Sequence, residues 1–133
     1  MKLIMYTDGG ARGNPGPAAT GVVIKNQKGE VIKNFGTYLG KQTNNFAEYS
    51  AAIEAFEAAY ALGAEEVELY LDSKLVAEQL NRNWKVKHPE IQKLFLKAWS
   101  AMQKFKRATI RHIAREKNKE SDAEVNKVLD SHA

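Results

Sequence analysis

The sequence has 133 residues, of which 44% are hydrophobic and 27% charged, and this composition and length are typical of one globular domain. The absence of cysteine excludes disulfide bonds and thiolate metal sites. The apolar stretches are far too short to span a membrane, and the N-terminal one ends at Thr7 and Asp8 where a signal peptide would continue, so we expect a cytoplasmic protein.

The net charge of +4 is unevenly distributed along the chain. Residues 79–119 contain 12 Lys and Arg against 2 Asp and Glu, whereas residues 1–78 and 120–133 each carry a net charge of −3. Trp84 lies within the basic segment, and a basic segment with an aromatic side chain suits the backbone of a polyanion such as a nucleic acid. A solvated basic helix face would give the same pattern, so the charge alone leaves both interpretations open.

The first third of the chain predicts strands. Residues 2–7 alternate and then turn polar, which predicts a strand that ends at Asp8. The glycines and prolines of residues 9–17 predict a tight loop. Two further strands, predicted over residues 20–25 and 31–39 around a short polar turn, complete an antiparallel meander with the first.

The rest of the chain predicts helices and strands in alternation. In chain order these are a helix over 45–62, a strand over 67–71, a short helix over 73–80, a helix from Pro89 to about Phe105, a strand over 108–113 and a helix over 120–130. The order βββαβααβα predicts a mixed sheet with helices packed on it, in one domain without linkers.

Two aspartates follow predicted strands. Asp8 follows the first strand and Asp72 the fourth. If these strands are parallel neighbours, both acids project at the carboxyl ends of adjacent strands, where open α/β sheets place their ligands. Asp8 before glycine is also a common turn signal, and Asp72 before a helix an ordinary cap, so each residue alone is ambiguous.

Two more acids lie near helix starts. Glu48 shares its helix face with Ala52, Ala55 and Ala59, and a carboxylate among residues that face a sheet needs a partner. Asp122 lies at the start of the last helix, and for both acids a favourable interaction with the helix dipole is the alternative explanation. Four such acids, if they converge, repel one another unless cations neutralise them, and oxygen ligands without cysteine favour Mg²⁺ or Mn²⁺ over Zn²⁺.

Four motifs resemble the ribonuclease H type 1 family in order and spacing. They are Asp8-Gly-Gly-Ala-Arg-Gly-Asn-Pro-Gly-Pro17, Thr43-Asn-Asn-Phe-Ala-Glu-Tyr49, Leu71-Asp-Ser73 and His112…Arg115-Glu-Lys-Asn118…Asp122. The resemblance covers essentially the whole chain and implies a single ribonuclease H domain over residues 1–133. It also implies a ribonuclease H-like α/β fold, with a five-stranded mixed sheet of order 3-2-1-4-5, strand 2 antiparallel, and helices on both faces.

The resemblance further implies an endonuclease that hydrolyses the RNA strand of RNA–DNA hybrids and leaves 5′-phosphate and 3′-hydroxyl ends. Asp8, Glu48, Asp72 and Asp122 are then the catalytic, metal-binding carboxylates, which hold two Mg²⁺ or Mn²⁺ ions. The implied partner is the hybrid duplex, without a membrane, and a monomer is the default state.

Several polar residues match substrate-binding positions of the family. Asn14, Asn44 and Asn45 match positions that contact the hybrid in its minor groove, where amides can pair with 2′-hydroxyls and base edges. Lys41 and Thr43 resemble the pocket that holds a phosphate of the DNA strand. Turn and helix-cap roles are the alternative interpretation of the asparagines.

The chain also departs from the family pattern. Arg115, seven residues before the last aspartate, resembles the arginine that some archaeal-type members use in place of the active-site histidine, and His112 is the second candidate for this catalytic role. Residues 82–89 are too few for the extra basic helix and loop of many bacterial members, which indicates a compact form. Trp84 and Lys85 are expected to replace part of that substrate-binding element, although Trp84 suits a packing role equally well.

Two further departures concern the fourth-strand motif and the last helix. Lys74 stands where many relatives have glutamine, and the last helix reads Asp-Ala-Glu-Val-Asn in place of the usual Asp-x-Leu-Ala. The first departure puts one minor-groove contact in question, and the second the docking of the helix. A catalytically silent hybrid-binding module and an actin-like phosphotransferase are the alternatives to a nuclease, but the latter needs a second lobe for which the chain is too short.

Overall fold

The computed structural model describes all residues from 1 to 133. Six strands, four helices and one turn of 3₁₀ helix follow one another along the chain. In chain order they are β1 (Lys2–Ala11), β2 (Gly16–Lys25), β3 (Val31–Phe35), β4 (Tyr38–Gln42), α1 (Asn44–Ala61), β5 (Glu66–Leu71), α2 (Lys74–Leu80), α3 (Pro89–Met102), β6 (Arg107–His112), η1 (Arg115–Lys117) and α4 (Lys119–Ser131). None of the helices is long and apolar enough to cross a membrane.

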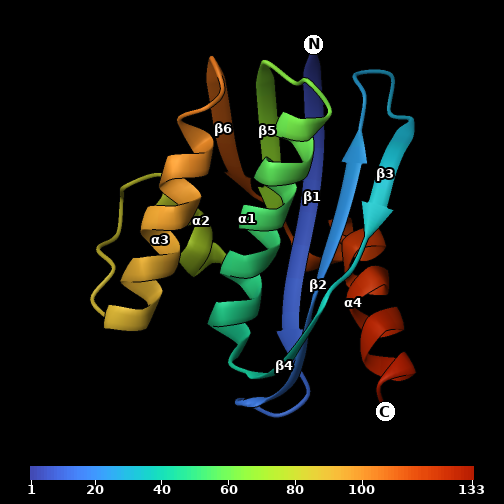
Figure 1. Cartoon of the computed structure of the whole chain (residues 1–133), viewed down its shortest axis with the longest axis vertical. Coiled ribbons are helices and arrows are strands. Elements are labelled where there is room, and N and C mark those ends of the chain that lie inside the picture. The colour runs from blue at the N-terminus through green and yellow to red at the C-terminus, as the bar shows by residue number, and fades with distance from the viewer.

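All six strands belong to one mixed sheet. The main path runs β3-β2-β1-β5-β6, and β4 pairs with β2 beside β3 (Figure 1). Strand β2 is antiparallel to β1, β3 and β4, whereas β1, β5 and β6 are parallel. The predicted order 3-2-1-4-5 with an antiparallel second strand is therefore confirmed, and β4 is an additional short strand.

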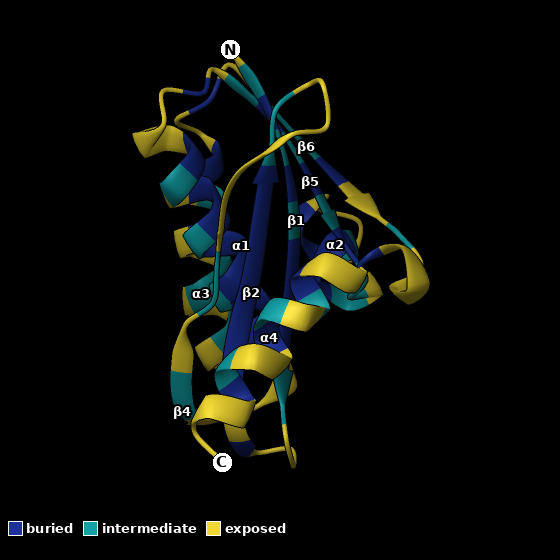
Figure 2. Cartoon of the chain, turned by 90° about the vertical axis from the view of Figure 1, so that its right-hand side faces the viewer, coloured by how far each residue is buried: buried dark blue, intermediate teal, exposed yellow.

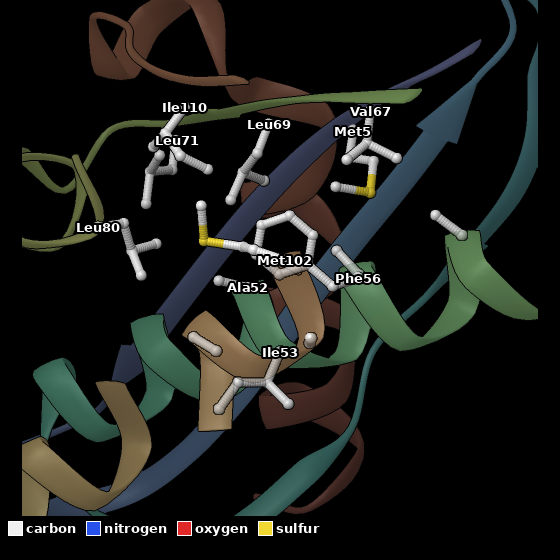
Figure 3. Close-up of a cluster of buried hydrophobic side chains, with 14 of the residues drawn as sticks. Met5, Ala52, Ile53, Phe56, Val67, Leu69, Leu71, Leu80, Met102 and Ile110 are labelled. Atoms are coloured by element: carbon white, nitrogen blue, oxygen red, sulfur yellow. The ribbon is translucent and has the colours of Figure 1, made fainter. Parts of the chain in front are cut away.

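Helices cover the two faces of the sheet unequally. Helices α1 and α3 lie on one face and α4 on the other (Figure 2). The α1 face carries a core of 22 buried residues, in which Phe56 of α1 and Met102 of α3 pack toward Leu69 of β5 (Figure 3). The α4 face has only a small cluster of Ala19, Val125 and Leu129. The site described below lies between these two layers.

Strand β1 is longer than the sequence predicts. The prediction of a loop from residue 9 is wrong, because β1 continues to Ala11 and pairs there with Ala18 of β2. Gly9 belongs to the strand because it pairs with Thr20 of β2. The position requires glycine because a Cβ would lie 2.2 Å from the carbonyl carbon of Ala47 in α1. The turn is limited to the four residues between Ala11 and Gly16, and Asp8 therefore lies within β1.

The predicted strand over 31–39 is divided into β3 and β4. The backbone bends at Gly36, where a Cβ would lie 2.7 Å from both the Thr20 carbonyl oxygen and a methyl of Val128. Thr20 fixes the bend, because its backbone N–H donates to the Thr37 carbonyl at 2.9 Å and its hydroxyl accepts from the Thr37 N–H at 3.0 Å. Close packing against α4 therefore separates the two strands.

Helix α4 docks through polar contacts and close backbone approaches. Lys25 pairs with Glu120 at 2.6 Å, and Asn34 of β3 donates to Glu124 at 2.7 Å. Glu124 occupies the place of the family's usual leucine, and its partner in β3 explains how the helix docks with a polar residue there. Gly21 lets the helix approach β2 so closely that a Cβ would lie 2.1 Å from the Ser121 carbonyl oxygen.

Candidate functional site

Three of the four predicted carboxylates come together at one end of the sheet. Oxygen atoms of Asp8, Glu48 and Asp72 all lie within 4.8 Å of one another. Thr7 and Leu71 are paired in the parallel register of β1 and β5, so the aspartates that follow them are neighbours. Glu48 reaches the same point from α1, which packs on this side of the sheet. Strand pairing and helix packing thus bring together residues from three separate elements.

The backbone N–H of Gly9 joins Glu48 to Asp8. It donates to the Glu48 carboxylate at 2.8 Å and to the Asp8 carboxylate at 3.0 Å. Both acids are 8% exposed, so this donor offsets part of the cost of burying them. A side chain at position 9 would prevent this contact, because it would collide with the α1 backbone next to Glu48.

Burial and mutual repulsion disfavour the ionised forms of these acids. Burial, the neighbouring charge of Asp72 and a hydrogen bond with Asp122 raise the pKa of Asp8 to about 8. Burial and the charges of Asp8 and Asp72 also raise the pKa of Glu48 well above its ordinary value, against the opposing effects of the Gly9 N–H and Arg115. A divalent cation bound between these crowded carboxylates would favour their ionised forms and so lower their pKa values.

Asp122 and Arg115 line the same cleft. Its volume is about 520 Å³, and its walls include all four predicted acids, Arg115 and the polar side chain of Asn44. Asp122 lies in the first turn of α4 and is half-buried. The structure therefore gathers the four acids, with the tightest group formed by the three that do not come from α4.

Of the two candidates for the assisting role, only Arg115 lines the cleft. Arg115 begins the 3₁₀ turn η1, lines the cleft and lowers the pKa of Glu48 through its charge. His112 ends β6, is exposed and is not among the residues of the cleft. The geometry thus favours Arg115, as the sequence does.

Asn118 is a site residue for which the sequence predicted no role. It is 1% exposed, and its side-chain N–H donates to the Asp72 carboxylate at 3.1 Å and to the Thr7 carbonyl at 2.8 Å. Its amide oxygen accepts from the Ser121 hydroxyl at 2.7 Å. Asn118 therefore fixes both the orientation of Asp72 and the start of α4. Its presence in the last motif was the only signal, since an asparagine before a helix is also an ordinary cap.

Arg12 and Asn126 connect the β1–β2 turn to α4 at the other end of the cleft. The Arg12 guanidinium donates to Asp130 at 2.6 Å and more weakly to the Asn126 amide oxygen at 3.4 Å. The Asn126 amide in turn donates to the Asp122 carbonyl at 3.2 Å. The sequence did not single out either residue, because their contact depends on how α4 docks.

The predicted minor-groove asparagines have structural partners as well. Asn14 accepts from the backbone N–H of Asn44 at 3.0 Å, and Asn44 accepts from that of Ala11 at 2.8 Å. Thr43 caps α1 by accepting from the Phe46 N–H at 3.2 Å. Asn14 lies in the turn between β1 and β2, as the alternative interpretation expects, but the cap of α1 is Thr43 and not an asparagine. The contacts also fix the side chains of Asn14 and Asn44.

The remaining predicted substrate residues lie outside the acid cleft. Asn14, Thr43 and Asn45 line a shallow pocket of about 320 Å³ next to the start of α3. Lys41 is exposed on β4 and does not line this pocket. Trp84 and Lys85 lie in the segment between α2 and α3, where they border a separate hollow.

Comparisons with known proteins agree with this fold. Residues 6–128 match the family model described as reverse transcriptase-like, which defines the broad class of the protein. Ribonuclease HI of Halobacterium salinarum is 40% identical over 125 aligned positions, which cover 94% of this chain and 63% of the relative. The bifunctional protein Rv2228c of Mycobacterium tuberculosis is 39% identical over 134 aligned positions, which cover 100% of this chain and 37% of the relative.

Solved structures of similar proteins have the same fold over nearly the whole chain. The crystal structure of RNase H1 from Halobacterium salinarum NRC-1 has a TM-score of 0.96 at 38% identity, covering 98% of this chain and 99% of that one. LC11-RNase H1 in complex with an RNA/DNA hybrid has a TM-score of 0.93 at 41% identity, with 98% of each chain covered. The chain belongs to the ribonuclease H type 1 family. It spans only 37% to 63% of the length of the curated relatives named above.

Proposed function

We propose that this chain is a ribonuclease H, an endonuclease that hydrolyses the RNA strand of an RNA–DNA hybrid. The observation that carries the proposal is the convergence of Asp8, Glu48 and Asp72 within 4.8 Å, with Asp122 in the same cleft. Two findings support it. A relative of similar sequence is named ribonuclease HI, and a solved structure with the same fold was determined with an RNA/DNA hybrid.

The donor set fits hard divalent cations. Asp8, Glu48, Asp72 and Asp122 offer only carboxylate oxygens, the ligands that Mg²⁺ and Mn²⁺ prefer. Burial and the charges of neighbouring acids raise the pKa values of Asp8 and Glu48, which a bound cation would oppose. We infer that these four residues hold two such ions. When bound, the ions supply activation of a water molecule and stabilisation of the leaving oxygen.

The reaction breaks the bond between phosphorus and the 3′-oxygen of the RNA strand. Water adds its oxygen to phosphorus, its proton passes to solvent, and the departing 3′-oxygen takes up a proton, which leaves 5′-phosphate and 3′-hydroxyl ends. Arg115 stabilises the negative charge that develops on the phosphoryl oxygens, or assists release of the product phosphate. His112 is the second candidate for this role. Asn118 holds Asp72 in its orientation.

The hybrid lies across the end of the sheet in this proposal. Asn14, Asn44 and Asn45 contact its minor groove, where the 2′-hydroxyls distinguish RNA from DNA. Lys41 and Thr43 hold a phosphate of the DNA strand. Trp84 and Lys85 extend the contact toward the basic segment, which carries a net charge of +10 over residues 79–119. We further propose that residues 1–133 act as one domain, as a monomer, in the cytoplasm.

A cleavage assay tests the proposal directly. The protein is incubated with an end-labelled RNA–DNA hybrid in Mg²⁺ or Mn²⁺, with the same sequence as duplex RNA and as duplex DNA for comparison. We expect cuts in the RNA strand of the hybrid only, with 5′-phosphate ends. Salt-sensitive binding without cuts in either metal contradicts the nuclease and supports a silent binding module, and equal cleavage of all three duplexes contradicts the substrate assignment.

A further inference from the structure

A hollow of about 580 Å³ lies between α3 and residues 81–88, away from the acid cleft. Its apolar walls are formed by Trp84, Val86, Phe95 and Leu96. Trp84 is 44% exposed and Leu96 63% exposed, so this apolar surface is open to solvent. Exposed apolar side chains that gather in one hollow are typical of a binding site rather than of a solvated face.

The charged residues that line the hollow are all cations. None of its nine lining residues is acidic, and two are the cations Arg82 and Lys85. The side-chain amides of Asn83 and Gln92 donate to Glu78 and to the Val86 carbonyl, and their amide oxygens accept no hydrogen bond. Neither cation takes part in any of the five ion pairs of the structure. Arg82 instead lies over the Trp99 ring at 5.1 Å, and Lys74 lies over the Trp84 ring at 5.9 Å. The hollow thus combines aromatic surfaces with free positive charge.

Arg82 occupies a backbone position that normally belongs to glycine. Its φ of 66° is in the left-handed region, and it follows the last residues of α2 in a helix-ending turn, with the Arg82 N–H bonded to the Gln79 carbonyl and the Asn83 N–H to that of Glu78. Glycine adopts this conformation without strain, and arginine does not. The backbone arrangement does not require this side chain, which points to a role for the guanidinium itself.

We propose that this hollow binds a nucleotide of a single strand that continues beyond the hybrid. The base packs against Trp84 and Leu96, the amide oxygens of Asn83 and Gln92 accept from its polar edge, and Arg82 and Lys85 hold the adjoining phosphates. The inference rests on the proposed function, because the single strand is the continuation of a hybrid that binds in the acid cleft. Lys74 links the two sites: it lies two residues after Asp72 and contacts Trp84.

The chemistry distinguishes this ligand from a protein partner. An acidic peptide would use the two cations but would leave the aromatic walls and the amides without a specific role. A nucleotide uses all three, since it combines a flat π-surface, a hydrogen-bonding edge and a negative phosphate. The two possible sources are the DNA strand and the RNA strand of the hybrid, and the experiment compares them.

Tryptophan fluorescence reports on the hollow directly. Trp84 and Trp99 are the two tryptophans of the chain, so the Trp99→Phe variant leaves Trp84 as the single reporter. This variant is titrated without divalent metal with a blunt hybrid, with the same hybrid carrying a single-stranded DNA or RNA tail, and with a tail of equal charge that lacks bases. We expect the base-bearing tail of one strand to quench Trp84 and to bind about tenfold more tightly than the abasic tail. Equal affinities for the two tails overturn the proposal.

A matched pair of exposed leucines provides the mutational control. Both leucine variants are made in the Trp99→Phe background, so that Trp84 remains the reporter. Leu96→Glu places a negative charge in the hollow, whereas Leu62→Glu replaces an exposed leucine at the end of α1. We expect only Leu96→Glu to abolish the preference for the base-bearing tail, with both variants folded by circular dichroism. The same loss in both variants overturns the proposal, as does quenching of Trp84 by an acidic peptide but not by any tail.

The proposal and the nuclease assignment fail separately. The titrations need no metal and no turnover, so tail binding by a protein that cuts nothing contradicts only the nuclease. A protein that cuts blunt hybrids but shows no preference for base-bearing tails contradicts only the assignment of the hollow.

Discussion

The two faces of the sheet are built differently, and the candidate site takes residues from both. The α1 face rests on 22 buried residues, and it positions Glu48 beside the strand residues Asp8 and Asp72. The α4 face rests on a three-residue cluster supplemented by hydrogen bonds and ion pairs, and it supplies Asp122. The layer with the larger core therefore positions the tightest part of the site, and a more polar layer completes it.

The largest expected effect tests the ranking of the acids. Asp8→Asn keeps the shape of the side chain but removes a carboxylate from the tight group, so we expect hybrid cleavage to fall by on the order of a thousandfold. Asp122→Asn should cost less, because Asp122 lies outside the group within 4.8 Å. Initial rates at saturating Mg²⁺ measure both. A greater loss for Asp122→Asn would show that the α4 layer carries the more important acid.

A pair of leucines tests the packing of the two faces. Leu69 is fully buried on the α1 face and Leu129 is 4% exposed in the α4 cluster. We expect Leu69→Ala to lower the free energy of unfolding by about 4 kcal/mol and Leu129→Ala by about 2 kcal/mol, because the smaller cluster can relax around the cavity. Urea denaturation measures both values. Equal losses would contradict the claim that the faces differ in packing.

Asn118 joins the two layers, and its removal should affect both activity and stability. Asn118→Ala leaves the Thr7 carbonyl without its donor and frees Asp72, so we expect about a 10-fold to 100-fold loss in hybrid cleavage and a loss of about 1–3 kcal/mol in unfolding free energy. Activity assays at a temperature where the variant is fully folded separate the two effects. For comparison, Asn126→Ala removes the longer contacts of an exposed side chain, among them one to the Asp122 carboxylate at 3.4 Å, and should cost less in both measurements.

The smallest expected effect concerns a charge on α1 that faces β2. Burial raises the pKa of Glu54, although the Thr20 hydroxyl donates to it at 2.6 Å. Since the pKa is higher in the folded state, its contribution to stability is fully present below the unfolded pKa and is lost as the pH rises through the folded value. Glu54→Gln should therefore flatten the decrease in thermal stability above pH 4 that this group causes. Melting curves between pH 4 and pH 7 measure it, and an unchanged pH profile contradicts the assignment.

The sequence predicted the order of elements and the four acids because both depend on local patterns. The helix around Glu48 and the strand before Asp72 follow from periodicity, and the motifs identify the family. The extent of β1 was not predictable, because Gly9 and Gly10 are typical turn residues and belong to the strand only through their pairing with β2. The division between β3 and β4 depends in the same way on contact with α4 at Gly36.

Local sequence patterns also could not identify the residues that act by positioning other residues. Asn118 and Arg12 work through partners far away in the chain, and nothing near them in the sequence indicates those partners. The hollow beside Trp84 exists because residues 81–88 pass between α2 and α3 without a helix of their own. The sequence indicated that the extra basic helix and loop of many bacterial family members are absent. Only the fold shows that a hollow lies at this place.

The missing side chain at Gly9 has a consequence for how the site can change. The β1 and α1 backbones are at their closest at this position, where any Cβ would collide with the Ala47 carbonyl group. The Gly9 N–H can therefore hold the Glu48 and Asp8 carboxylates together, at 2.8 Å and 3.0 Å. A change that pushed the two backbones apart would displace α1 and disturb the core of 22 residues against which the helix packs.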